Sequence, residues 1–324
     1  MKIEKITRTQ IYLTLLVIIS VSILGVSCGK TTENKDVEKK VKKPRIALIM
    51  KSLANEFFKT MEEGARKHHQ AHLSEYDLIV EGIKDELDIN RQVQLMENMI
   101  GQKVDAIVIA PADSKALVPV CKRAMKEGII VINIDNRLDE EVLKQNEIKI
   151  PFVGPDNRKG AREVGLYLAE RLQAGEHVAV INGVPTAYNA IQRRLGFLDA
   201  IKEKGLNLVA DENGDWEMSK ANKVVSALMT EKPEIKGIFC ANDSMALGAI
   251  SALKAGNFMD KVKVVGFDNI SAANELVEKG ELLATADQHA DHLAVYGIEY
   301  ALECLKTGTV PEDKETPVDL IVKK

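Results

Sequence analysis

Aromatic residues are scarce in this chain. They make up 4% of its 324 residues, and Trp216 is the only tryptophan. Basic charge is scarce as well: the formal net charge is -4. It becomes -6 without residues 1–27, which carry three basic residues and one acidic residue. Nucleic-acid binding needs a basic patch or stripe, so the composition argues against a nucleic-acid partner.

The motifs of common enzymes and metal sites are also missing. The sequence has no glycine-rich phosphate loop, no serine nucleophile elbow and no paired-acid motif. His68 and His72 have the spacing that can hold zinc on one helix face, but no Glu follows His68. A solvated helix face is therefore the better interpretation. We expect no catalytic residue, no metal and no cofactor, and we expect that the protein is not an enzyme.

The start of the chain predicts an export signal. Three basic residues precede an apolar run over residues 11–26, and the run ends next to Cys28. This arrangement is similar to a bacterial lipoprotein signal, in which residues 1–27 are removed and Cys28 carries a lipid; a plain N-terminal membrane anchor is the alternative. Residues 28–43 are polar and highly charged, as in a flexible tether. Either version places the globular part in the periplasm or on the outer face of the cytoplasmic membrane.

The other three cysteines, Cys121, Cys240 and Cys304, lack the spacing of a metal site. Each falls in an apolar strand or a helical pattern, so we expect buried thiols.

Short apolar runs alternate with segments of helical periodicity from residue 45 onward. Alternation of strand and helix at this spacing predicts a parallel sheet covered by helices on both faces. The alternation of strands and helices is interrupted near residue 151 and then restarts, which predicts two similar lobes. The expected fold class is therefore α/β, with two Rossmann-like, doubly wound parallel sheets. The expected strands are residues 45–50, 76–82, 104–110, 129–134, 177–181, 206–210, 235–241, 262–267 and 282–286.

Three segments are expected to cross between the lobes and form a hinge. Residues 151–157 contain two prolines and a glycine, residues 287–289 follow the last expected strand, and residues 317–322 close the chain as an extended segment. The expected lobes are residues 44–154 with 289–319, and residues 155–288 with 320–324. Such a hinge suits a clamp that closes on a ligand.

One strand-to-helix junction illustrates the predicted site. Asn242 and Asp243 follow the apolar run 235–241, and small and apolar residues at helical spacing begin at Ser244. Ligands of open parallel sheets bind at the carboxyl ends of strands. We interpret Asn242 as a ligand contact and Asp243 as the helix cap, although both residues are also common in turns.

Polar and aromatic residues recur at the other strand ends and crossings. Carboxylates accept hydrogen bonds from hydroxyls, amides both donate and accept, guanidinium donates, and flat rings cover C–H faces, so this mixture suits a sugar. A buried sugar also needs its hydroxyls paired. The predicted ligand-binding residues are Asn55, Phe57, Phe58, Asp135, Asn136, Arg193, Trp216, Asn242, Asp268 and Gln288.

The order and spacing of these residues resemble the ribose-binding protein family of periplasmic sugar-binding proteins, over almost all of the chain from Pro44. The resemblance implies that Phe58 and Trp216 sandwich a monosaccharide with Phe57 nearby, while the polar residues supply hydrogen bonds. It also implies delivery to the permease of an ABC transporter, and we expect a monomer. The segments that carry it are Asn55-Glu-Phe-Phe58, Ile134-Asp135, Arg193-Arg-Leu-Gly-Phe197, Phe239-Cys-Ala-Asn242-Asp-Ser-Met-Ala-Leu-Gly248, Val265-Gly-Phe-Asp268, Ala284-Thr-Ala-Asp-Gln288 and Pro317-Val-Asp319.

Two departures from that family widen the choice of ligand. Asn136 stands where ribose binders usually have arginine, with Arg137 one place later, and Trp216 stands where phenylalanine is common. Another pentose, a hexose or a cyclic polyol therefore stays open. A repressor with the same core would need a DNA-reading headpiece, whereas this chain begins with a hydrophobic leader. A sensor that presents its closed form to a chemoreceptor or sensor kinase is the alternative function.

Overall fold

The structure is a computed structural model that describes residues 42–324. The predicted export signal, Cys28 and all but the end of the tether lie outside the described residues.

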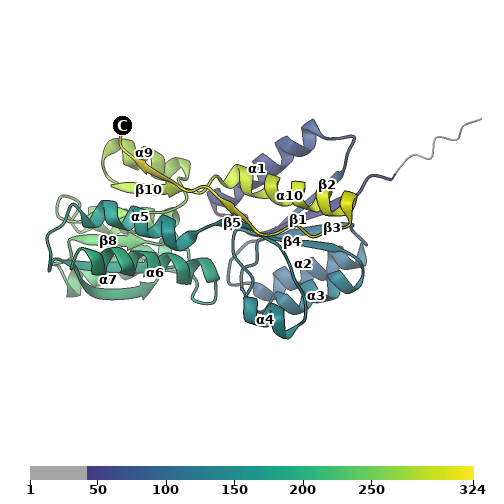
Figure 1. Cartoon of the computed structure of the whole chain (residues 1–324). Coiled ribbons are helices and arrows are strands. Elements are labelled where there is room, and N and C mark those ends of the chain that lie inside the picture. Colours follow the sequence, from purple (N-terminus) through teal and green to yellow (C-terminus); the bar gives the residue numbers. More distant parts are fainter. Residues whose placement is uncertain (1–41) are drawn as a thin grey trace, which may run out of the picture. The chain divides into compact units, whose positions relative to one another are not determined.

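Two six-stranded sheets organise this part of the chain (Figure 1). All strand pairs are parallel except β10 with β12, which is antiparallel. The first sheet has the order β11 (Lys314–Thr316), β5 (Phe152–Pro155), β4 (Ile130–Ile134), β3 (Ala106–Ile109), β1 (Arg45–Ser52) and β2 (Asp77–Ile83). The second has the order β12 (Asp319–Val322), β10 (Ala284–Asp287), β9 (Lys263–Val265), β8 (Gly237–Cys240), β6 (His177–Asn182) and β7 (Asn207–Asn213).

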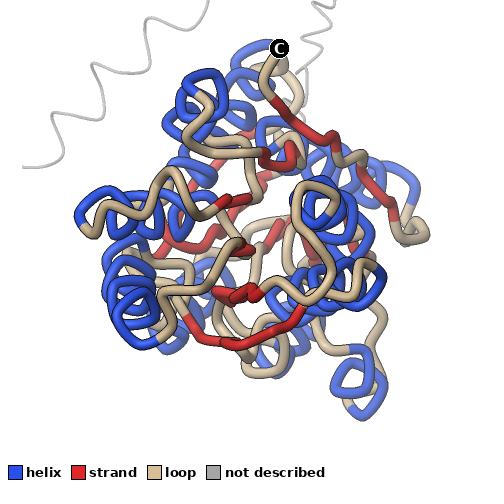
Figure 2. The backbone as a smooth tube through the Cα atoms, turned by 90° about the vertical axis from the view of Figure 1, so that its left-hand side faces the viewer, coloured by secondary structure: helices blue, strands red, loops and turns tan. Residues whose placement is uncertain are grey.

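Helices cover both faces of each sheet, and the tube in Figure 2 shows helices on either side of the strands. On the first sheet, α1 (Glu56–Ala71) packs with α10 (Ala290–Thr307), and α2 (Ile89–Gly101) packs with α3 (Val118–Lys126). On the second, α5 (Asn157–Ala169) packs with α6 (Tyr188–Glu203), and α7 (Met218–Glu231) packs with α8 (Asp243–Ala255). The short α4 (Glu140–Gln145) and α9 (Ser271–Lys279) complete the set. The predicted α/β class with two doubly wound sheets is confirmed.

Burial explains why the strands form where they do. In β1 the residues from Ile46 to Ser52 are all buried, because helices cover both faces of a parallel sheet. The helices begin where a polar side chain accepts a backbone N–H, as Asp88 does for α2 and Asp156 does for α5. The short helix α4 was not predicted; Asp139 caps it in the same way.

The chain passes from one sheet to the other three times. It leaves the first sheet after β5, returns when α10 packs on β3 and β4, and leaves again between β11 and β12. The yellow C-terminal segment in Figure 1 runs along both sheets. The carboxyl ends of the parallel strands in both sheets carry the loops that contain the predicted site residues.

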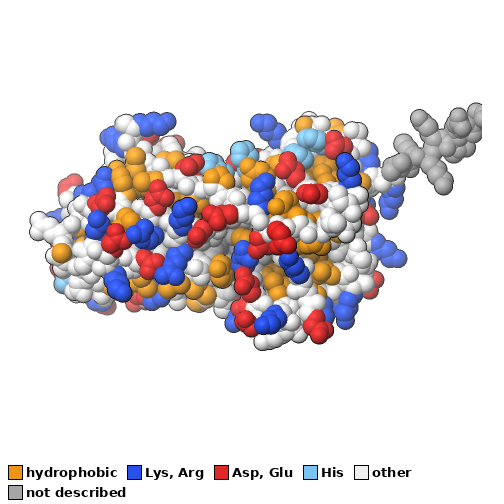
Figure 3. All heavy atoms as spheres, in the orientation of Figure 1, with side chains coloured by type: hydrophobic (Ala, Val, Ile, Leu, Met, Phe, Trp, Pro, Cys, Tyr) orange, Lys and Arg blue, Asp and Glu red, His pale blue; other side chains and the backbone are white. Residues whose placement is uncertain are grey.

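Among residues 42–324, no helix is both long and apolar enough to cross a bilayer. On the face drawn in Figure 3, acidic and basic side chains are interspersed.

The three cysteines in this part of the chain are buried free thiols, as predicted.

The junction between β8 and α8 corrects one detail of the sequence interpretation. Asn242 Oδ1 accepts the backbone N–H of Met245 at 2.9 Å, so Asn242 is the helix cap. The prediction that Asp243 is the cap is wrong. Asp243 is fully buried inside the second lobe, where its carboxylate accepts from Thr285 Oγ1 at 2.7 Å and from Ile270 N at 3.1 Å. It ties the start of α8 to strand β10 and to the loop after β9.

Burial raises the pKa of Asp243 to about 7, although the hydrogen bonds from Thr285 and the backbone lower it. A carboxyl whose pKa is higher in the folded than in the unfolded state binds more protons when folded. Its stabilising effect is therefore complete below the unfolded pKa and is lost as the pH rises through about 7.

Asp243→Asn should flatten this pH dependence, because an amide has no charge to bury and still offers one acceptor and one donor to Ile270 and Thr285. We expect the wild type to lose about 2 kcal/mol more of its free energy of unfolding than the variant between pH 5 and pH 8. Urea unfolding at the two pH values measures this difference. An equal loss in both proteins would show that Asp243 stays ionised throughout.

Candidate functional site

One pocket gathers nine of the ten predicted ligand-binding residues. They come from loops and helix starts that follow strands of both sheets, so the pocket lies between the lobes. Three residues that the sequence interpretation missed, Lys51, Glu86 and Asn189, line it too. The first lobe contributes Lys51, Asn55, Phe57, Phe58, Glu86 and Asp135, and the second contributes Asn189, Arg193, Trp216, Asn242, Asp268 and Gln288.

The pocket is a narrow slot. The centre of a water molecule can move through only about 20 Å³ of it, which is room for about one water molecule. The side chains of the two lobes therefore nearly fill the slot.

Aromatic rings from both lobes flank the slot. Lys51 Nζ lies 5.6 Å from the centre of the Phe58 ring and 5.8 Å from that of Trp216, so both rings approach the same point from opposite lobes. Phe57 meets Phe58 edge to face at 5.1 Å. Flat rings arranged in this way can cover the apolar faces of a ligand ring.

The position of Trp216 depends on unusual backbone. Asp215 and Trp216 both have positive φ, 51° and 67°. The indole also lies against the backbone of Gly183, where an added Cβ would come within 2.1 Å of the ring. Asp135 and Asp268 have positive φ as well, at 61° and 123°. Such strained residues are frequent at binding and active sites.

A buried ion-pair cluster forms the first-lobe side of the slot. Lys51 Nζ lies 3.1 Å from Asp135 Oδ2 and 3.6 Å from Glu86 Oε2, and all three side chains are almost completely buried. Burial lowers the pKa of Lys51, but the two carboxylates outweigh it, so this pKa is raised and the ammonium is retained. Burial raises the pKa of Glu86 to about 7 despite the attraction of Lys51.

A second charged cluster comes from the other lobe. Arg193 Nη1 donates to Asp268 Oδ1 at 3.2 Å and to the carbonyl of Ala241 at 2.9 Å. Gln288 Nε2 donates to the same Asp268 oxygen at 2.7 Å. Burial raises the pKa of Asp268 to about 7, opposed by Arg193. The arginine also lies 5.6 Å from the Trp216 ring centre, which fixes its guanidinium beside the slot.

Three buried polar atoms of the slot have no hydrogen-bond partner: Asn189 Oδ1, Trp216 Nε1 and Gln288 Oε1. Asp135 Oδ2 has its ion pair with Lys51 but receives no hydrogen bond. An unpaired buried polar group costs about 1–3 kcal/mol. The slot therefore presents one donor and several acceptors to a ligand that can pair with all of them.

Asn136 lies outside this slot. Its Nδ2 donates to the carbonyl of Pro111 at 2.8 Å, and its Oδ1 accepts the backbone N–H of Asn189 at 3.0 Å. These bonds hold the side chain between the two lobes. Its amide is therefore engaged by protein atoms instead of facing the ligand space.

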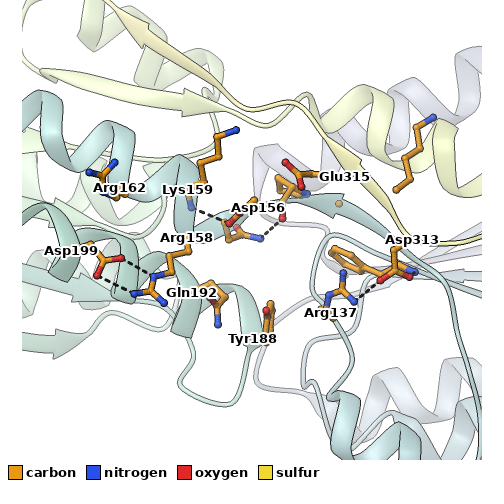
Figure 4. A pocket seen from close by; sticks show the side chains of 15 residues that line it. Arg137, Asp156, Arg158, Lys159, Arg162, Tyr188, Gln192, Asp199, Asp313 and Glu315 are labelled. Atoms are coloured by element: carbon orange, nitrogen blue, oxygen red, sulfur yellow. Dashed lines mark hydrogen bonds and ion pairs between the residues drawn. The ribbon is translucent and has the colours of Figure 1, made fainter.

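Arg137 also points away from the slot. It forms an ion pair with Asp313 at 2.7 Å and lies on the Phe152 ring at 4.3 Å, in a separate groove beside the lobe crossings (Figure 4). That groove is lined by alternating acidic and basic side chains, many of them paired with each other, as Arg158 is with Asp199. Lys51 and Arg193 therefore supply the cations of the slot, and Arg137 does not.

The histidines of α1 serve local packing. His68 and His72 stack at 4.1 Å, and His68 Nδ1 lies 2.9 Å from the hydroxyl of Tyr76. Within residues 42–324, no group of three His, Cys, Asp or Glu side chains is arranged to hold a metal ion.

Comparison with known proteins agrees with this geometry. Residues 46–309 match the periplasmic binding protein domain family. A D-ribose/D-allose-binding protein of Pseudomonas aeruginosa is 53% identical over 283 residues, covering 86% of this chain and 89% of the relative. An ABC transporter solute-binding protein from Burkholderia multivorans superposes with a TM-score of 0.85 at 53% identity, covering 87% of this chain and all of the other. One from Actinobacillus succinogenes with bound D-allose gives 0.82 at 36% identity, covering 87% and 98%.

The ion-pair cluster predicts a specific pattern of stabilities. Lys51→Met leaves Asp135 and Glu86 buried without a cation, so we expect a loss of about 3 kcal/mol in the free energy of unfolding at pH 8. Glu86→Gln should recover part of that loss in the Lys51→Met background and be destabilising on its own. Urea unfolding of the four proteins gives the coupling energy.

Lys59→Met, on the exposed face of α1, is the matched control and should be close to neutral. If Glu86→Gln changes stability equally with and without Lys51, the two side chains do not interact and the cluster is misassigned.

Proposed function

The chain belongs to the periplasmic binding protein domain family, and from that premise we propose that it captures a monosaccharide for an ABC transporter. The observation that carries this proposal is the slot between Phe58 and Trp216, where buried polar atoms lack partners. Each sugar hydroxyl both donates and accepts a hydrogen bond. A sugar ring can therefore pair Trp216 Nε1, Asn189 Oδ1 and Gln288 Oε1 while the aromatic rings cover its faces.

The pyranose form of D-allose or D-ribose is the proposed ligand. The two sugars have the same configuration at carbons 2, 3 and 4, and they differ by the hydroxymethyl group on carbon 5. Two similar proteins are described with these sugars: the Pseudomonas relative with ribose and allose, and the Actinobacillus protein with allose. Lys51 and Asp135 on one side, and Arg193 and Asp268 on the other, would fix the hydroxyls.

The proposed site binds its sugar without converting it. Each carboxylate of the slot is engaged by a cation: Asp135 and Glu86 by Lys51, and Asp268 by Arg193. This arrangement suits hydrogen bonding to hydroxyls. It leaves no carboxylate placed alone as a base or nucleophile.

Capture works by closing the lobes, which we assign to residues 44–154 with 289–319 and residues 155–288 with 320–324. The ligand contacts both lobes at once, and only such differential contact shifts an open–closed equilibrium. The closed form, as a monomer, is what the permease recognises. A lipid on Cys28 followed by the polar residues 28–43 would hold the protein at the outer face of the cytoplasmic membrane.

D-Allose and D-ribose should raise the melting temperature, because a ligand bound only by the folded state stabilises it by about 2.7 kcal/mol at 100 times its Kd. D-Glucose, which differs from D-allose only at carbon 3, should have a much smaller effect, since it leaves one buried partner unpaired. Thermal unfolding with each sugar measures this. If no pentose, hexose or inositol raises the melting temperature, the proposed function is wrong.

Gln288→Leu should abolish the shift, because it removes a buried donor and acceptor from the slot. Gln192→Leu makes the same chemical change in the separate groove beside the lobe crossings and should leave the shift intact.

The lipid anchor has its own test. Cells fed radioactive palmitate should label the wild type and Cys121→Ser, whose thiol is buried in the first lobe, but not Cys28→Ser. Equal labelling of all three proteins, or of none, contradicts the proposed anchor.

A further inference from the structure

Two helices of the second lobe begin after a residue whose side chain cannot cap them. The N-cap residues of α6 and α9 are Ala187 and Ile270, and neither side chain can accept a hydrogen bond. The first N–H groups of a helix have no partner inside the helix and need one elsewhere. Helix α6 begins beside the slot, whereas the hydrogen bonds at the start of α9 are exposed to solvent.

The partners of α6 come from the other lobe. Tyr188 N donates to Ser114 Oγ at 2.9 Å, and Asn189 N donates to Asn136 Oδ1 at 3.0 Å. Ser114 and Asn136 follow strands β3 and β4 of the first sheet and are buried. The carbonyl of Thr186, just before the helix, accepts from Ser114 N at 3.3 Å, so the contact runs in both directions.

The start of α9 is held in the same way. Ser271 N donates to Glu56 Oε1 at 2.8 Å, and the Ser271 hydroxyl bonds the same oxygen. Glu56 is the first residue of α1 in the first lobe. The negative charge of its carboxylate also complements the positive end of the α9 dipole.

We infer that Glu56, Ser114 and Asn136 are closure residues: they cap α6 and α9 across the cleft and so set the affinity for sugar without touching it. We call these contacts the cross-lobe caps. When the lobes separate, the caps break and water must replace them. Their contribution therefore favours the closed state alone.

Residues of the cross-lobe caps also line the slot or are adjacent in sequence to residues that line it, so the caps and the slot are coupled. This coupling rests on the proposed function. Asn189 receives a cap on its backbone and places its unpaired Oδ1 in the slot. Glu56 lies between Asn55 and Phe57, which both line the slot. The cross-lobe caps therefore form in the same movement that brings these side chains to the ligand.

A closure residue has a signature that a ligand-contacting residue lacks. Because the caps hold the lobes closed, losing one speeds dissociation and does not slow association. The effect is also the same factor for every sugar, since no cap contacts a hydroxyl. Loss of an N-cap corresponds to about a fivefold change in an equilibrium constant.

Trp216 is the only tryptophan and lines the slot, so stopped-flow fluorescence of the full chain in detergent reports both rates. Glu56→Ala and Ser114→Ala should each raise the dissociation rate about fivefold, equally for D-allose and D-ribose. Glu56→Asp keeps the charge at the start of α1 but is too short to reach Ser271, so it should behave like Glu56→Ala. Glu63→Ala, at an exposed position on the same helix, should have no effect.

Acrylamide quenching of Trp216 without sugar tests the caps independently of the ligand. Trp216 is buried when the lobes are closed, so opening should expose it and increase quenching in Glu56→Ala and Ser114→Ala. A protein that binds none of the sugars but shows this increase would refute the proposed function and keep the caps. Sugar binding with unchanged rates and quenching in both variants would refute the caps alone.

Ala187→Ser adds the opposite test, because a serine at this N-cap position, with its extended backbone, caps α6 from within its own lobe. An N-cap side chain accepts from the second or third N–H of its helix, so the serine replaces the acceptor that Asn136 offers to Asn189 N. Asn136→Ala should then raise the dissociation rate less in this background than in the wild type. A full fivefold effect in both backgrounds would contradict the inference. Melting temperatures confirm that each variant is folded.

Discussion

The structure depends on charges that are removed from water between two lobes. Lys51, Glu86 and Asp135 come from one lobe and Arg193 and Asp268 from the other, and all five side chains are buried. An isolated buried ion is expensive, so each needs a partner of opposite charge. The pairs are made within each lobe, so that either lobe keeps its ions satisfied when the other moves away. What the lobes share are the two aromatic rings and the cross-lobe caps, which can separate without stranding a charge.

The fold was predictable because its signal is local. Apolar runs of strand length followed by amphipathic segments recur along the chain, and parallel sheets bury such strands on both faces. The strand boundaries moved by up to three residues, as where the strand expected at residues 206–210 runs over Asn207–Asn213. The capping role of Asn242 was not predictable from its place beside Asp243, because either side chain can cap a helix. Thr285 and Ile270, both distant in the chain, donate to the Asp243 carboxylate and so engage it elsewhere.

The site was predictable in part for the same reason. Rings, amides and acids at strand ends indicate a ligand edge, and nine of the ten chosen side chains line the slot. Lys51 was missed because a lysine after an apolar strand usually reaches solvent, and only the positions of Asp135 and Glu86 show that it is buried. Asn136 was predicted to bind the ligand because it follows Asp135, yet its amide accepts a hydrogen bond from Asn189 of the other lobe. Pairing across elements is not encoded in the local pattern, so residues of this kind become visible only in three dimensions.

The last strands of the chain have a consequence for biogenesis. Strands β11 and β12 are separated by two residues, and each completes the edge of a different sheet. Helix α10, which covers one face of the first sheet, is made only after the entire second lobe. Neither half can finish folding until the C-terminus has been synthesised, since these contacts join residues far apart in sequence. A periplasmic protein that is threaded unfolded through a translocation channel benefits from this delay, because its folding stays incomplete until the last residues are made.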